Sequence, residues 1–341
     1  LAKASPLRIM LFMFAVTAII SAFLDNVTTV MILVPIALLI AGELKIDPIP
    51  FIITMAIASN IGGTATMIGD PPNILIGSAT DYTFMDFIYH LTPIVALITI
   101  SSLGITYLLY RKGIRVSNEN KARLMEYREE NLIKNRKLLH RSLIVVFLML
   151  SAFMLQDRLN LEIAPIAMVS GLILLILNNR KRVDKVLVND IDWATIFFFI
   201  GLFMIVESLI ETGFIGLISD QIIRLSGSNI KAASLIILWF SGFFSAIIDN
   251  VPFVTTMIPL IKDIGTHFSR EAMHPVWWAL SLGACLGGNG TLIGASANIV
   301  SVGIAHRNGY VIKFSDFTKI GVIYTLNSLI LSSLYIWIRY F

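Results

Sequence analysis

Long stretches without charge restrict the fold of this chain more than any other feature of its sequence. Residues 92–110, TPIVALITISSLGITYLLY, carry no charged side chain. An apolar run of about 18 or more residues is typical of a helix that spans a bilayer. Inside a bilayer every backbone N–H and C=O group needs an internal partner, so only helices and closed barrels cross it. Several such runs therefore predict an all-α polytopic membrane protein.

Composition and charge agree with this class. Of the 341 residues, 56% are hydrophobic and 14% are charged, against about 25% charged residues in a soluble domain. The net charge of +4 is concentrated in residues 111–141, which hold ten Lys or Arg against four Glu. Basic loops of membrane proteins stay in the cytoplasm. We expect a lipid bilayer around the chain, no nucleic-acid partner, and a multi-pass location in a bacterial or archaeal plasma membrane.

Two motifs occur twice at almost one spacing. Asp25-Asn26-Val27 recurs as Asp249-Asn250-Val251, 224 positions later. The stretch IGGTATMIGDPPNI (61–74) recurs as LGGNGTLIGASANI (286–299), 225 positions later. Self-similarity at a fixed spacing indicates a structural repeat. The chain is therefore predicted to hold two homologous halves.

The basic loops give these halves opposite directions. Residues 111–141 and 178–185 are both basic and so lie inside, which means that two spans between them, about 142–156 and 162–178, go out and return. Inverted repeats are typical of secondary transporters. The predicted first repeat is 1–110 (hairpin 9–42, broken helix 50–79, span 87–110), followed by the cytoplasmic loop 111–141 and a second repeat 142–341 (scaffold spans 142–213, hairpin 231–263, broken helix 274–305, span 317–340).

Each Asp-Asn pair joins two short apolar arms. The arms of the first copy, about 9–24 and 29–42, would be roughly 21–24 Å long as helices, and a bilayer core is about 30 Å thick. We interpret both segments as re-entrant helical hairpins whose tips lie near the middle of the membrane. Two tilted spans remain an alternative.

The second pair of segments, 50–79 and 274–305, carries clustered glycine and proline, which do not suit a helix interior. Unwound backbone survives in lipid only where protein or a water-filled cavity covers it. These segments are therefore predicted to be two broken transmembrane helices that line a cavity. The alternative is that the glycines only permit close helix packing.

Oxygen-bearing side chains gather at the hairpin tips and at the breaks. Carboxylate, amide, hydroxyl and backbone oxygens suit a hard cation, and half-helix ends suit ions of either sign. We expect Na⁺ or H⁺ as the coupling ion, with Na⁺ at Asp25, Asn26, Asp249 and Asn250, no cofactor and no catalytic residue. Helix capping is the alternative role for the Asn and Thr residues. The candidate ion- or substrate-binding residues are Asp25, Asn26, Thr28, Thr29, Gly63, Thr64, Thr66, Asp70, Asn73, Asp249, Asn250, Thr255, Gly288, Asn289, Thr291 and Asn298.

Two of the three candidate aspartates match each other between the repeats, and the third has no match. Asp25 and Asp249 are equivalent, and a charge at mid-membrane costs about 2.5–3.5 kcal/mol, so we expect these two to face one cavity and carry the coupling ion. Asp70 has no counterpart, because Ala295 takes its place. It is either a further proton or cation site or the cap of a half-helix that begins at Pro71. The single Cys285 is expected to be a small buried residue, since one thiol forms neither an intrachain disulfide nor a thiolate metal site.

The stretches SAFLDNVTTVMILVPI, NIGGTATMIGDPPNILI and IDWATIFFFIGLFMIVESLIETG resemble the ion transporter superfamily. The most similar branch holds arsenical-pump membrane proteins, NhaD-type sodium–proton antiporters and the melanosomal P protein. The resemblance implies a scaffold domain and a mobile transport domain made of the hairpins and broken helices. In the related dicarboxylate transporters the tips carry Ser-Asn-Thr motifs. Asp25-Asn26-Val27 and Asp249-Asn250-Val251 stand at those positions here, which favours a cation or proton.

These observations predict a secondary active ion transporter that works by alternating access, with sodium–proton antiport as the leading activity. The alternative is efflux or uptake of an anion, either arsenite or antimonite or a di- or tricarboxylate, so the partner is a small inorganic or carboxylate ion. A passive anion channel is the rival class. An intramembrane aspartyl protease is disfavoured, because Met67 stands where its Gly-x-Gly-Asp signature has the first glycine. A homodimer is compatible with this class.

The halves are also unequal in length. Three spans precede the second hairpin and none precedes the first, so the repeat predicts roughly 80 residues and about three spans ahead of Leu1.

Overall fold

The computed structural model describes residues 5–111, 116, 136–159, 161–178, 193–213, 217, 221, 224–225, 229–266, 268–269 and 271–341. These residues form helices and connecting turns, and no strand occurs among them. Most of the predicted basic loop 111–141, nearly all of the loop 178–185, and Asp192 lie outside the described residues. The chain divides into two compact units. The first is Leu1–Asp81 with Phe87–Glu126 and Val206–Phe341, and the second is Tyr82–Asp86 with Tyr127–Ile205.

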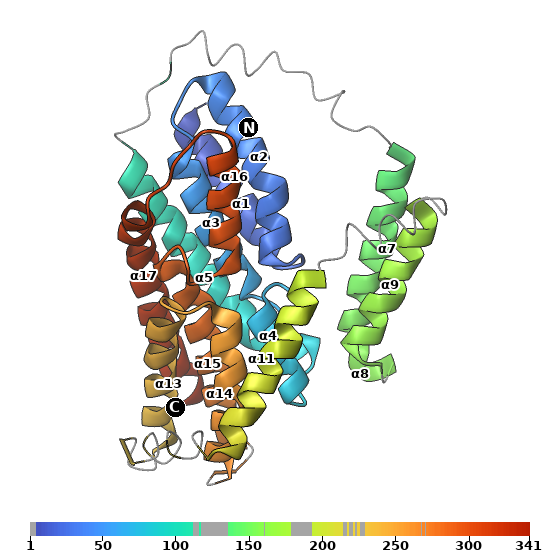
Figure 1. Ribbon diagram of the computed structural model, residues 1–341, viewed down its shortest axis with the longest axis vertical. Helices are drawn as coiled ribbons and strands as arrows, with labels where there is room; N and C mark the ends of the chain where they lie inside the picture. Colours follow the sequence, from blue (N-terminus) through green and yellow to red (C-terminus); the bar gives the residue numbers. More distant parts are fainter. Residues whose placement is uncertain are drawn as a thin grey trace. The chain divides into compact units, whose positions relative to one another are not determined.

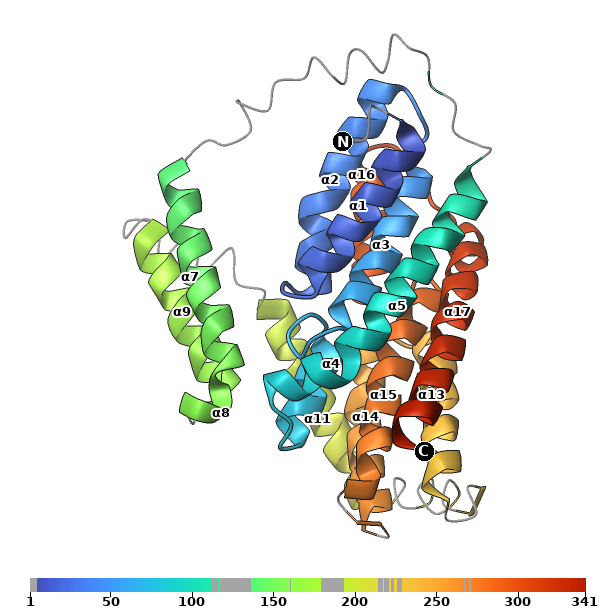
Figure 2. The same ribbon diagram turned by 180° about the vertical axis from the view of Figure 1, so that it is seen from behind.

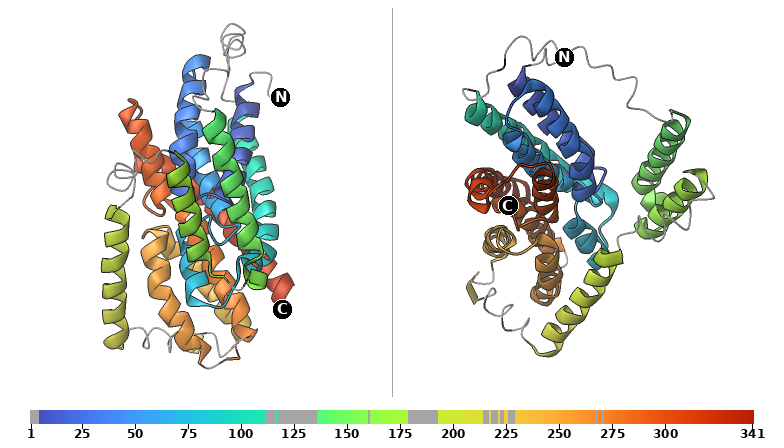
Figure 3. Two further views of the ribbon diagram at one scale, coloured as in Figure 1. Left: turned by 90° about the vertical axis from the view of Figure 1, so that its right-hand side faces the viewer. Right: turned by 45° about the horizontal axis from the view of Figure 1, so that its top comes forward.

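The first unit contains both predicted helical hairpins (Figures 1 and 3). Helix α1 (Pro6–Ser21) turns back into α2 (Asn26–Leu44), and α13 (Ile230–Ser245) turns back into α14 (Asn250–Gly265). The second helix of each hairpin begins at the Asn of the Asp-Asn pair, because the Asp is its N-cap. That these hairpins re-enter the membrane stays a prediction.

The two broken helices follow the hairpins. Helix α3 (Ile49–Gly63) is separated by residues 64–70 from α4 (Pro71–Ala79). Helix α15 (His274–Gly287), a short turn η4 (Gly288–Gly290) and residues 291–295 precede α16 (Ser296–Arg307). Helix α3 is buried from Phe51 to its end and α15 from Pro275 to its end, as expected for apolar helices surrounded by protein.

The packing repeats as well. Helix α1 packs on α3, and α13 packs on α15. The last helix of each repeat, α5 (Phe84–Tyr110) and α17 (Phe314–Tyr340), lie side by side over the residues of α5 that belong to this unit (Figure 2). They run antiparallel. The Thr106 and Tyr324 hydroxyls lie 2.8 Å apart, and the Ser101 hydroxyl donates to Asn327 Oδ1 at 2.8 Å. Near the start of α5, His90 Nδ1 lies 2.6 Å from the hydroxyl of Tyr340 at the end of α17.

The second unit contains α7 (Arg136–Met154), α8 (Gln156–Leu159) and α9 (Ile163–Asn178), with α7 packed on α9. Its short piece Tyr82–Asp86 is attached through the Phe84 N–H group, which donates to Gln156 Oε1 at 3.2 Å, and through the Phe84 and Phe153 rings. Helix α11 (Trp193–Glu211) is divided between the two units after Ile205.

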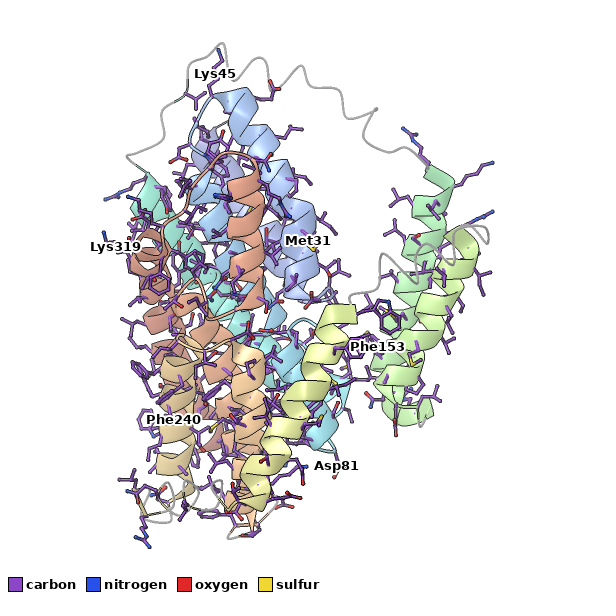
Figure 4. The ribbon with its side chains drawn as sticks, viewed as in Figure 1. Met31, Lys45, Asp81, Phe153, Phe240 and Lys319 are labelled. Carbon is purple, nitrogen blue, oxygen red and sulfur yellow. The ribbon has the colours of Figure 1, made fainter. Side chains whose placement is uncertain are left out.

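Four of the described helices are long and apolar enough to cross a membrane: α2, α5, α7 and α17. Large apolar side chains stand on their outer surfaces, as Met31 does on α2, where it is 58% exposed (Figure 4). A soluble protein would not expose so many. The chain is an all-α polytopic membrane protein.

Candidate functional site

The carboxylate of Asp70 lies where the two hairpin tips meet. Asp70 precedes α4 but makes no side-chain cap bond to it, and its side chain is 0% exposed. Asn26 at the first tip donates its amide to Oδ1 at 3.0 Å. Asn250 at the second tip donates to Oδ1 at 3.3 Å and to Oδ2 at 3.4 Å. Among the described residues no lysine, arginine or histidine pairs with Asp70.

Asp25 and Asp249 cap helices at the rim of this site. Asp25 accepts from the Thr28 backbone N–H group at 3.0 Å and from its hydroxyl at 3.3 Å. Asp249 accepts from the Val251 N–H group at 3.0 Å and from the Ser296 hydroxyl at 2.7 Å, which joins the second tip to the start of α16. Both side chains are partly exposed. In the structure these aspartates cap helices, whereas from the sequence we considered capping only for the Asn and Thr residues.

Asn60, near the end of α3, connects Asn26 to the second repeat. Its Oδ1 accepts from Asn26 at 3.2 Å. Its Nδ2 donates to Asn289 Oδ1 at 2.9 Å and to Asn298 Oδ1 at 3.0 Å. We did not select Asn60 from the sequence, because its counterpart 225 positions later is Cys285. A single amide within the apolar run FIITMAIASNI was the signal available.

Asn73 and Asn298 are equivalent residues that hold the two breaks. Asn73 Nδ2 donates to the carbonyls of Thr64 at 3.2 Å and Thr66 at 2.9 Å. Asn298 Nδ2 donates to the carbonyls of Gly288 at 2.8 Å and Thr291 at 2.9 Å. Each amide thereby replaces helix bonds that the break removes.

The oxygens of these two amides face the opposite repeat. Asn73 Oδ1 accepts from the Ser281 hydroxyl at 2.6 Å and from the Cys285 thiol at 3.6 Å, both on α15. Asn298 Oδ1 accepts from Asn60 on α3. Each half-helix that follows a break is therefore bonded to the broken helix of the other repeat, and Cys285, which is fully buried, belongs to the site.

Most of the predicted threonine hydroxyls donate to backbone carbonyls. Thr66 and Thr291 donate to the carbonyls of Ala22 and Ala246, both at 2.5 Å, and so join each break to its own hairpin turn. Thr64 and Thr255 donate to carbonyls four residues earlier in the chain, at 2.7 and 2.9 Å. These four hydroxyls stabilise the geometry of the site and leave few oxygens of their own for an ion.

The sequence model of the citrate transporter family matches residues 1–283. The chain belongs to the citrate transporter family. An uncharacterized transporter of Mycobacterium tuberculosis is 39% identical over 341 residues, which are all of this chain and 79% of the relative. The "46 kDa membrane protein" of Mycobacterium leprae is 38% identical over 98% of this chain and 78% of its own length. The mouse P protein is 30% identical over 97% of this chain and 49% of its own length.

Membership of the citrate transporter family confirms the predicted class, an integral multi-pass membrane transporter and not an enzyme. The similarity to the P protein confirms the branch that the tip and break motifs indicated. The family name states citrate for the family as a whole, and the mycobacterial relatives are named without a solute.

Two predicted glycines allow the breaks to fold back closely. A Cβ atom on Gly63 would lie 2.5 Å from the carbonyl oxygen of Gly69, and one on Gly288 would lie 2.8 Å from that of Gly294. Both distances are shorter than any van der Waals contact, so these positions need glycine. Their role in this member of the citrate transporter family is to shape the loop that carries Asp70 and its counterpart.

Two of the predicted residues hold buried polar atoms without a partner in the part of the chain that the structure describes. They are the Thr29 hydroxyl on α2 and the Asn289 Nδ2 amide nitrogen in η4. Both residues are 0% exposed. A buried polar group without a hydrogen bond is uncommon and requires an explanation.

Proposed function

We propose that the protein is a cation-coupled secondary transporter in which Asp70 is the group that binds and releases the coupling ion. The carrying observation is the Asp70 carboxylate, fully buried and held by one amide from each repeat. A buried ionised carboxylate without a counter-charge is strongly unfavourable. Asp70 therefore needs a bound cation or a proton when the site is closed.

The donors around Asp70 disfavour a metal ion more than a proton. Asn26 and Asn250 present N–H groups to the carboxylate, and an N–H group repels a metal ion at the same lone pairs. A protonated carboxyl group still accepts such bonds through its carbonyl oxygen. Because the donors come from both tips, separation of the tips would remove them and favour proton exchange with water. Sodium–proton antiport is the first activity to test, and Na⁺ would then reach the Asp70 carboxylate only after the tips have separated.

Transport of an anion is the second candidate. The unpartnered amide of Asn289 favours it, as does the name of the family. A passive anion channel differs from both, since only a coupled transporter accumulates an ion against its own gradient.

A proteoliposome assay with an internal pH dye tests the role of Asp70. We expect imposed Na⁺ gradients to move protons with the wild-type protein, and Asp70→Asn to lose at least nine-tenths of this coupled flux. Asn keeps the size of the side chain and one oxygen acceptor but cannot exchange a proton. Matched retention on size exclusion would show that the variant folds. Coupled flux at the wild-type rate in Asp70→Asn would refute the proposal.

A further inference from the structure

The orientation of one amide between the repeats, that of Asn298, is fixed by neighbouring backbone. Both N–H groups of Asn298 point at carbonyls, and turning the amide over would place its oxygen against those two oxygens. Asn298 must therefore present Oδ1 to Asn60. Asn60 in turn must present Nδ2, which has two N–H groups.

The second N–H group of Asn60 determines the orientation of the Asn289 amide. Asn60 Nδ2 lies 2.9 Å from the Asn289 amide oxygen, and turning Asn289 over would bring two N–H donors together. On the other side, Asn60 Oδ1 already accepts from Asn26, so Asn60 itself cannot turn. The network leaves Asn289 Nδ2 as a donor with no acceptor among the described residues.

Asn289 Nδ2 differs from the other unpartnered buried atoms because its position in the amide is fixed. Those of Thr29, Ser102, Ser241, Thr318 and Ser332 are hydroxyls, which rotate and exchange donor and acceptor roles. Asn327 also has an unpartnered amide nitrogen, but its oxygen accepts only from the Ser101 hydroxyl. That hydroxyl would equally accept from the nitrogen if Asn327 turned over. Among the unpartnered amides in the described part of the chain, Asn289 alone is held in place by another amide.

We infer that Asn289 donates a hydrogen bond to an anionic oxygen of the solute that the protein carries. An N–H donor excludes a cation at that position and favours a carboxylate or oxyanion oxygen. Asn60 is a positioning residue, because it holds the Asn289 oxygen and so directs the nitrogen at the solute. The inference rests on the proposed transport function and separates two positions within it: Asp70 for the coupling cation, and Asn289 for the anion.

The repeat supports this division. The counterpart of Asn289 is Thr64, whose hydroxyl already donates to the Asn60 carbonyl. The first repeat therefore has no free donor at the equivalent point, but it supplies Asp70, where the second repeat has Ala295. Each repeat contributes one of two chemically opposite groups.

Asn289→Asp tests the inference in proteoliposomes made with the full chain. Aspartate keeps an oxygen for Asn60 and replaces the donor by a second acceptor. Asn327→Asp is the matched control, since it makes the same change at the other amide with an unpartnered nitrogen, on α17. The probes are citrate, succinate and phosphate, with arsenite for comparison, since at neutral pH it is present mainly as uncharged arsenous acid. The readouts are KM for the solute and the cation concentration that gives half-maximal flux.

We expect at least one anionic probe to be carried, its KM to rise tenfold or more in Asn289→Asp, and the half-maximal cation concentration to stay within twofold. Asn327→Asp should leave KM within twofold. Should Asn289→Asp fail to fold, Asn289→Thr introduces the residue of the first repeat and one rotatable donor, and a threefold or greater rise in KM is expected. The rise in the thermal unfolding midpoint that the carried anion causes in the purified protein should become smaller as KM rises.

An unchanged KM in a folded Asn289→Asp variant would overturn the inference. Exchange of Na⁺ and H⁺ with transport of none of the three anions would also overturn it, while leaving cation coupling at Asp70 intact. Loss of the anion affinity in Asn289→Asp together with full coupled flux in Asp70→Asn would instead refute the role of Asp70 alone.

Discussion

The side-chain amide of Asn250 donates to both carboxylate oxygens of Asp70, at 3.3 and 3.4 Å, although 180 positions separate the two residues. The second hairpin tip is thereby bonded to the break of the first repeat. Asn26 makes the equivalent bond from within that repeat. A single carboxylate is thus bonded to both hairpins, which is the arrangement that its proposed role in coupling requires.

Removing either tip amide should weaken both stability and coupling. Asn250→Ala and Asn26→Ala each leave Asp70 with one fewer donor, and a buried hydrogen bond of this kind is worth about 1 kcal/mol. We expect a lower thermal unfolding midpoint for each variant and a coupled flux reduced at least fivefold. Asn308→Ala is the control, because Asn308 is exposed and its side-chain amide donates to the Ile304 carbonyl of α16, which it caps. Equal midpoints and fluxes in all three variants would show that the tips do not act through Asp70.

The tip aspartates should tolerate asparagine. Asp25 and Asp249 accept backbone N–H bonds as N-caps, and Asn caps a helix about as well as Asp. We therefore expect Asp25→Asn and Asp249→Asn to retain more than half of the coupled flux, which reverses the order of importance that the duplicated placement suggested. Loss of cation dependence in both variants, with Asp70→Asn active, would restore the hypothesis that the tips carry the ion.

Comparison of the two halves predicted the hairpins and the breaks, because these features are shared. It could not rank Asp70 or find Asn60, because each has a chemically different counterpart, Ala295 and Cys285. Where the two repeats meet, one supplies the Asp70 carboxylate and the other supplies Ala295. The site therefore uses positions at which the two halves differ. The capping role of the tip aspartates was accessible, since Asp directly before a helix is a common N-cap.

Topology gives a direct test of the inverted repeat. Lys45 follows α2 and Thr266 follows α14, and both are exposed. Single cysteines at these positions should react with a membrane-impermeant maleimide from opposite sides, at 45 from the cytoplasm and at 266 from outside. The native Cys285 is fully buried and should contribute little background. Reaction of both positions from one side would contradict the opposite orientation of the halves.

Glycine at the second break should be essential although it contributes no side chain. An added methyl group on Gly288 would lie 2.8 Å from the Gly294 carbonyl oxygen and 3.2 Å from the Ala295 Cβ atom. Backbone atoms cannot move aside as a flexible side chain can, and overpacking of this kind costs about 1–3 kcal/mol. Displacement of this turn would also shift the Gly288 carbonyl away from Asn298 Nδ2, which it now meets at 2.8 Å. We expect Gly288→Ala to lower the thermal midpoint and to lose most transport.

The control lies in the next helix. Gly303 of α16 has open space where a Cβ atom would stand, so Gly303→Ala should be neutral or stabilising by up to about 1 kcal/mol. The two variants make the same chemical change, and only the first meets backbone. If Gly288→Ala matched Gly303→Ala in thermal midpoint and transport rate, the close approach of Gly288 to Gly294 would not be needed for function. The difference between the two variants therefore measures what the fold of the break contributes to transport, separately from any side chain that binds an ion.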